Sequence, residues 1–159
     1  MLVTSRRIAL ALMWAVVLIA FALFFAGGND TWFDVPPLLA PIVVLASAVF
    51  VHFVIESTGY RTPAVPPGTP EDEARATSTQ AFGASQFKRM LPAEVPALVA
   101  VALAYATVDG GFFTYCTGAL ASIVLMALHA WPGEIQIAKV QASLERDGGD
   151  SYLREVLAG

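Results

Sequence analysis

The stretch that decides the fold is IALALMWAVVLIAFALFFA, residues 8–26, in which the indole of Trp14 is the only side chain suited to hydrogen bonding. As a helix rising about 1.5 Å per residue, it covers roughly 28 Å, close to the roughly 30 Å thickness of a bilayer's hydrocarbon core. Arg6 and Arg7 precede it, as in a signal peptide, but the apolar run exceeds the usual length of about 7–15 residues. We therefore predict an uncleaved transmembrane helix that ends at the two glycines of residues 27–28.

The composition of the whole chain supports the same class. Apolar residues make up 57% of the 159 positions and charged residues 14%, against roughly 45–50% and about 25% in soluble domains. An unpaired backbone group in lipid costs several kcal/mol, which excludes open sheets. The sequence therefore predicts an all-α, polytopic membrane protein.

Three further apolar runs follow, each bounded by proline, glycine or charged residues. We predict a transmembrane domain over residues 1–133, built of two helical hairpins joined by a cytoplasmic loop at 57–91. A short surface helix through about Thr79 is expected inside that loop, because Thr69, Pro70 and two acids form a helix start. The four predicted spans are residues 8–26, 38–56, 92–108 and 112–131.

The last segment, residues 134–159, is predicted to be a cytoplasmic tail with an amphipathic helix. Ile137, Val140 and Leu144 fall on one helical face, while Lys139 lies off it. Such a narrow apolar stripe is marginally stable alone in water. We therefore expect the tail to lie on the membrane surface or against a partner.

The basic residues predict the orientation. All nine fall within residues 6–7, 61–89 and 139–154, and lysine and arginine are enriched on the cytoplasmic side of membrane proteins. Both termini should therefore be cytoplasmic. Abundant alanine and an excess of arginine over lysine suggest a high-GC bacterial genome, and hence the bacterial cytoplasmic membrane. A chain of net charge −4 is an unlikely partner for nucleic acid.

One weak polar cluster is visible near the cytoplasmic ends of the predicted spans. His52 and Glu56 are four residues apart and so share a helical face. Together, such residues would suit a divalent metal, a proton relay or a cationic substrate. Carboxylates near the membrane boundary also reach water at little cost, so we expect these side chains to splay toward the headgroups around an apolar interior. The cluster comprises His52, Glu56, Glu94, His129 and Glu134.

The sequence offers no catalytic, cofactor-binding or metal-binding motif, and Cys116 has no companion thiol. We therefore predict a non-enzymatic accessory or interaction subunit that contacts the bilayer and a membrane or cytoplasmic protein through residues 57–91 and 134–159. The alternative is a small transporter or permease of two plus two helices. It would assemble as a homodimer and use the His/Glu cluster for transport. A metal-dependent membrane enzyme rests on that cluster alone. A polar cavity would favour the last two interpretations, and an apolar core the first.

Overall fold

The computed structural model describes residues 2–27 and 30–158, and in these residues it is all-helical, with no strands and 76% helix. Four helices are long and apolar enough to cross a membrane: Leu2–Ala26, Leu39–Gly59, Glu71–Ala106 and Gly111–Ala130. The all-α prediction is therefore confirmed, and the four long apolar helices are consistent with a multi-pass membrane protein. Gly28, predicted to end the first span together with Gly27, lies outside the described residues.

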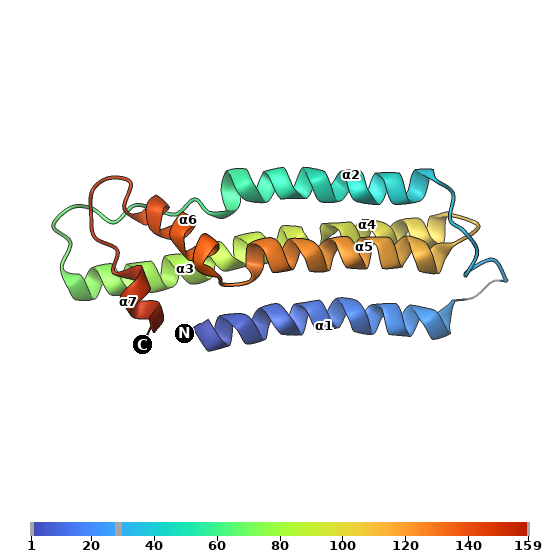
Figure 1. The fold of residues 1–159 in the computed structure, drawn as a ribbon, viewed down its shortest axis with the longest axis horizontal. Helices are drawn as coiled ribbons and strands as arrows, with labels where there is room; N and C mark the ends of the chain where they lie inside the picture. Colours follow the sequence, from blue (N-terminus) through green and yellow to red (C-terminus); the bar gives the residue numbers. More distant parts are fainter. Residues whose placement is uncertain (1, 28–29, 159) are drawn as a thin grey trace.

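The helices run back and forth along the bundle (Figure 1). Two of the spans end in a π-helical turn, η1 or η2, in which the helix is wider than an α-helix. The elements are α1 (Leu2–Ala26), α2 (Leu39–Val54), η1 (Ile55–Gly59), α3 (Glu71–Ala93), α4 (Val95–Ala106), α5 (Gly111–Leu125), η2 (Met126–Ala130), α6 (Glu134–Leu144) and α7 (Leu153–Ala158).

The antiparallel pair α4 and α5 forms the centre of the membrane region. α2 packs against both of these helices, and α1 packs against α5 on the opposite side (Figure 1). α1 and α2 are therefore separated by the central pair and do not form the packed hairpin that the chain order suggested. Small residues allow the close approach of α4 and α5, because a Cβ atom at Gly118 would stand 2.3 Å from the Cβ of Ala100.

Both chain ends lie at one end of the bundle, which we call the terminal end (Figure 1). The opposite end, the loop end, holds the turns around Pro36 and Gly110. There, Gly110 has a left-handed backbone conformation with φ of 69°, and a Cβ atom on it would meet the backbone of Pro36 at 2.3 Å. A glycine is therefore required where these two turns touch.

The connection between the second and third spans differs from the prediction. Residues 71–91 belong to one long helix, α3, and not to a loop with a short surface helix. Ala74, Ser78 and Phe82 recur at intervals of four and are all buried, so one face of this helix packs along its whole length. α3 and α4 together measure about 54 Å at 1.5 Å per residue, so α3 projects beyond the bundle at the terminal end (Figure 1).

The C-terminal residues pack on that projecting part of the chain. Ile137, Val140 and Leu144 are buried, as the helical periodicity predicted, but against residues of the same chain. The backbone N–H of Val65 donates to the carbonyl of Leu144 at 2.8 Å, which joins the connection after η1 to α6. The apolar stripe is therefore not free for a membrane surface or a partner, because α3 and the connection after η1 pack against α6.

Polar contacts fix the same cap of α6, α7 and the connection after η1. Arg75 of α3 forms an ion pair with Glu155 of α7. Partial burial raises the pKa of Glu145, but hydrogen bonds from Ser151 and Gln141 outweigh it, and the net pKa lies below the ordinary value. The ionised carboxylate therefore stabilises this cap above the ordinary pKa of the group, and the contribution is lost as the pH falls through its lowered pKa.

Candidate functional site

The two histidines meet at the terminal end of the membrane region. The Nδ1 atom of His52, from α2, lies 2.9 Å from the Nε2 atom of His129, from η2. The hydroxyl of Tyr60 lies 3.0 Å from the other ring nitrogen of His129, Nδ1. These three side chains form one hydrogen-bonded series, which we call the Tyr–His–His chain. Its members come from helix ends that both finish in a π-helical turn, a feature common at functional sites.

A carboxylate and an ammonium group flank this chain. Glu56 places Oε1 3.6 Å from Nδ1 of His129, which is beyond the hydrogen-bond range of about 2.6–3.2 Å. The Nζ atom of Lys139 donates to both carboxylate oxygens of Glu56 at 2.7 Å. The same Nζ atom lies 4.6 Å from the ring centroid of Tyr60. Lys139 therefore neutralises Glu56 beside the histidines.

Arg89, from α3, contacts two members of the Tyr–His–His chain and is completely buried. Its Nη1 atom donates to the backbone carbonyl of His129 at 2.7 Å, and its Nε atom donates to the carbonyl of Ser85 at 3.1 Å. The guanidinium carbon lies 4.6 Å from the ring centroid of Tyr60, a cation–π distance. Arg89 thus positions two members of the chain, one through its backbone and one through its ring.

The backbone around His129 is held by side chains from two other helices. The last carbonyls of a helix lack partners within the helix. In η2 the carbonyl of Leu128 accepts from Gln136 of α6, and the carbonyl of Ala130 accepts from Gln86 of α3 at 3.2 Å. With the bond from Arg89, three consecutive carbonyls are satisfied. These bonds hold the backbone of η2 in place and so fix the position of the His129 imidazole.

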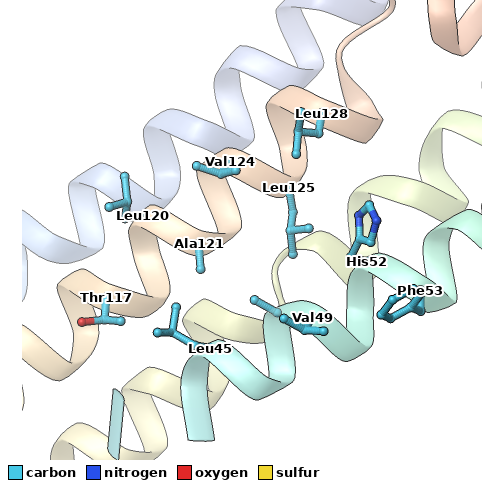
Figure 2. Close-up of a pocket in the computed structure, with 11 residues that line it drawn as sticks. Leu45, Val49, His52, Phe53, Thr117, Leu120, Ala121, Val124, Leu125 and Leu128 are labelled. Atoms are coloured by element: carbon cyan, nitrogen blue, oxygen red, sulfur yellow. The ribbon is translucent and has the colours of Figure 1, made fainter. Parts of the chain in front are cut away.

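An apolar groove of about 750 Å³ lies between α2 and α5 and ends at the Tyr–His–His chain. Figure 2 shows Leu45 and Thr117 near one end, and His52, Phe53 and Leu128 near the other. His52 is the only member of the chain that lines this groove. The groove therefore runs along the membrane helices and presents one imidazole, that of His52, at its end.

The hydrogen-bonding capacity of the chain leaves one position open. A neutral imidazole has one donor and one acceptor, and a phenol can do either. If Tyr60 donates to His129, then His129 donates to His52, and Nε2 of His52 remains as a donor. In the reverse polarity, Nε2 of His52 remains as an acceptor. In both cases this nitrogen has no hydrogen-bond partner among the described residues, and a hydroxyl or acid group in the groove would satisfy it.

The structure brings together three of the five residues of the predicted cluster. His52, Glu56 and His129 converge, so the expected splaying toward the headgroups is wrong for them. The two histidines face one another because α2 packs against α5 and because side chains of α3 and α6 bind the backbone around His129. The nearest histidine–carboxylate pair, at 3.6 Å, is nevertheless an electrostatic contact and not a hydrogen bond.

The other two carboxylates lie elsewhere. Glu134 is exposed and forms an ion pair with Arg154 at 2.7 Å, within the C-terminal segment. Glu94 was expected at the depth of the histidines because a helix was predicted to start there. α3 already precedes it, so Glu94 lies deeper, at the junction of α3 and α4.

Sequence reasoning missed Tyr60, Arg89 and Lys139. Arg89 carried a usable signal, because Phe82, Ser85, Gln86 and Arg89 fall on one face of a helix, at the spacing of a buried stripe. Tyr60 and Lys139 gave no such signal, since their places depend on where η1 ends and how α6 folds back.

Within the described residues, no group of three or more histidine, cysteine, aspartate or glutamate side chains is arranged to hold a metal ion. No protein-family model, curated protein or solved structure matches the chain. The groove and the side chains at the end of the groove are therefore the features that bear on function.

Proposed function

We propose that this chain is a non-enzymatic accessory subunit of the bacterial cytoplasmic membrane, and that it binds an amphiphile in the groove between α2 and α5. The observation that carries the proposal is the apolar groove of about 750 Å³ with the open Nε2 atom of His52 at its end. We propose that both termini lie in the cytoplasm, since the basic residues gather toward the terminal end.

The groove has the dimensions and chemistry of a site for one apolar chain. Thr117 and Leu128, near its two ends, are separated by about 16 Å along the helix. The side chains between them, such as Leu120 and Val124, offer no polar selectivity. The occupant is therefore recognised by its length and by a hydroxyl or acid head that bonds to His52.

The polar groups support binding and not catalysis. Lys139 occupies both oxygens of Glu56, and Arg89 is enclosed and bonded to backbone carbonyls. His129 uses both ring nitrogens within the chain. Among the three members of the Tyr–His–His chain, His52 alone has a ring nitrogen left to meet a ligand in the groove, which suits recognition of a head group.

A larger side chain in the groove tests this proposal. Ala121 lines the groove, whereas Ala127 is an exposed alanine further along the same span and outside the groove. We expect Ala121→Phe to reduce the co-purified amphiphile at least about tenfold, equivalent to about 1.4 kcal/mol of binding, and Ala127→Phe to retain it. Mass spectrometry of lipids extracted from protein purified in mild detergent gives the comparison. Equal amphiphile content in the two variants would refute the groove as the binding site.

A proton-coupled permease is the second candidate, and the Tyr–His–His chain is the observation that favours it. Hydrogen-bonded imidazoles and phenols can pass a proton by reversing their polarity. The cavity at the end of this chain is apolar, however, and an apolar lining supplies no polar selectivity for a transported solute. Proton entry into vesicles that contain the protein, abolished by His129→Phe, would favour the permease over the accessory subunit.

A further inference from the structure

Glu94 lies deep in the membrane region. Gln86, whose amide donates to the carbonyls of Ser5 and Ala130, marks the level at which the bundle begins at the terminal end. Glu94 is about 12 Å further along the helix, and Ala106, at the loop end, is about 18 Å beyond it. The carboxylate is therefore attached near the middle of the part of this helix that lies within the bundle.

The surroundings of Glu94 are apolar. It lines a small pocket of about 70 Å³ between α1 and α4, together with Leu12, Val16 and Tyr115. The Tyr115 hydroxyl is already engaged, because it donates to the carbonyl of Val16 at 2.8 Å. Glu94 makes no capping hydrogen bond to α4, and its carboxylate has no hydrogen bond or ion pair with any described residue. The pocket therefore offers it no cation.

We infer that Glu94 is the docking point for a transmembrane helix of another protein, and that this helix carries a lysine or arginine at the matching depth. Ionisable side chains within membrane spans pair with one another, and polar contacts join membrane helices where lipid cannot satisfy them. Glu94 is attached about 12 Å from the level of Gln86, which is farther than a glutamate side chain extends toward the headgroups. The face formed by α1 and α4 thus needs a partner that brings a positive charge.

A second copy of this chain does not meet that need. A symmetric dimer through this face would place two Glu94 side chains at the same depth, where like charges repel. Arg89 is fully buried, and Arg6 and Arg7 lie at the terminal end of the bundle, about 12 Å short of this depth. Lys88 is exposed, but it lies about 9 Å nearer the terminal end and about 120° away around the helix. The inferred partner is therefore a different protein.

The inference deepens the accessory role proposed above and rests on that role, but it does not rest on the groove between α2 and α5. The groove lies on the α2 side of the central helix pair, whereas Glu94 faces α1. Loss of the amphiphile and loss of helix pairing are therefore separate measurements.

The test uses the full-length protein in lipid vesicles, with a synthetic helix as the probe. The probe is a transmembrane peptide of about 20 leucine and alanine residues with one arginine about 12 Å from its end. Energy transfer between dyes on protein and peptide reports their association. We expect the arginine peptide to associate about tenfold more strongly than an all-apolar peptide. Glu94→Gln should remove this difference, and Glu134→Gln, at an exposed carboxylate, should keep it.

A charge exchange guards against a variant that fails to fold. Glu94→Arg should lose the arginine peptide and gain association with a peptide that carries glutamate at the same depth. The inference is overturned if arginine and apolar peptides associate equally, or if Glu94→Gln binds the arginine peptide as strongly as the unmodified protein does. It is also overturned if energy transfer between two copies of the chain, and not between chain and peptide, depends on Glu94.

Discussion

Gly118→Val is expected to lower the free energy of unfolding by about 3 kcal/mol, because α4 and α5 approach one another too closely at this glycine to admit a side chain. A Cβ atom there would stand 2.3 Å from the Cβ of Ala100 and 2.5 Å from the backbone oxygen of Pro96. The backbone oxygen cannot rotate away. The two helices would have to move apart, which would disrupt the packing of the central pair.

Gly83→Val provides the matched control. Gly83 also lies in a helix, α3, but a Cβ atom added there meets nothing within 4 Å. Glycine and valine differ modestly in helix propensity, so this change should alter the free energy of unfolding by no more than about 0.5 kcal/mol. Circular dichroism in mixed micelles of mild detergent and dodecyl sulfate measures both. If Gly118→Val unfolds at the same dodecyl sulfate fraction as Gly83→Val, the close packing of α4 and α5 is wrong.

Arg89→Ala should have an effect of similar size, about 3 kcal/mol. The substitution empties the space of a completely buried side chain and removes the side-chain donors to the carbonyls of His129 and Ser85. The Ser85 carbonyl keeps the backbone donor of its own helix, so the unpaired carbonyl is that of His129. The substitution also removes the cation that stacks on Tyr60. The Tyr–His–His chain would lose its support on two sides, so bound amphiphile should fall together with stability.

Lys88→Ala tests whether this effect is specific to the buried cation. Lys88 is the adjacent residue, carries the same charge and is exposed, so its removal should change stability by less than about 0.5 kcal/mol. The same unfolding titration and lipid extraction apply to both variants. Equal losses for Lys88→Ala and Arg89→Ala would mean that positive charge near the membrane boundary matters, and that the contacts of Arg89 do not.

The membrane helices could be predicted from the sequence because each one contains a long, mostly apolar run. Residues 8–26 show this plainly: no side chain in the run requires a partner outside lipid. The length of α3 was underestimated because most residues of its first half are polar. Of the buried positions Ala74, Ser78 and Phe82, only Phe82 carries a large apolar side chain. The start of that helix also decides the depth of Glu94, so one misplaced boundary moved a candidate residue.

The convergence of His52 and His129 could not be predicted in the same way. Each histidine ends an apolar helix, and the sequence gives no sign of whether the two helices are neighbours. Their contact depends on α2 packing against α5 and on the π-helical turns that end both spans. Tertiary packing of this kind leaves no periodic trace in the chain. Arg89 is the exception, since its spacing from Ser85 and Phe82 was visible.

The central claim is that the Tyr–His–His chain opens at His52 into a groove that holds an amphiphile. Nitrogen-15 NMR of the histidine rings in detergent tests it most directly, with a long-chain carboxylic acid as the probe. We predict a hydrogen-bond coupling between Nδ1 of His52 and Nε2 of His129, which lie 2.9 Å apart. Adding the acid should shift the Nε2 signal of His52 in the unmodified protein and not in Ala121→Phe. Uncoupled rings, with a His52 signal that the acid leaves unchanged, would contradict the account.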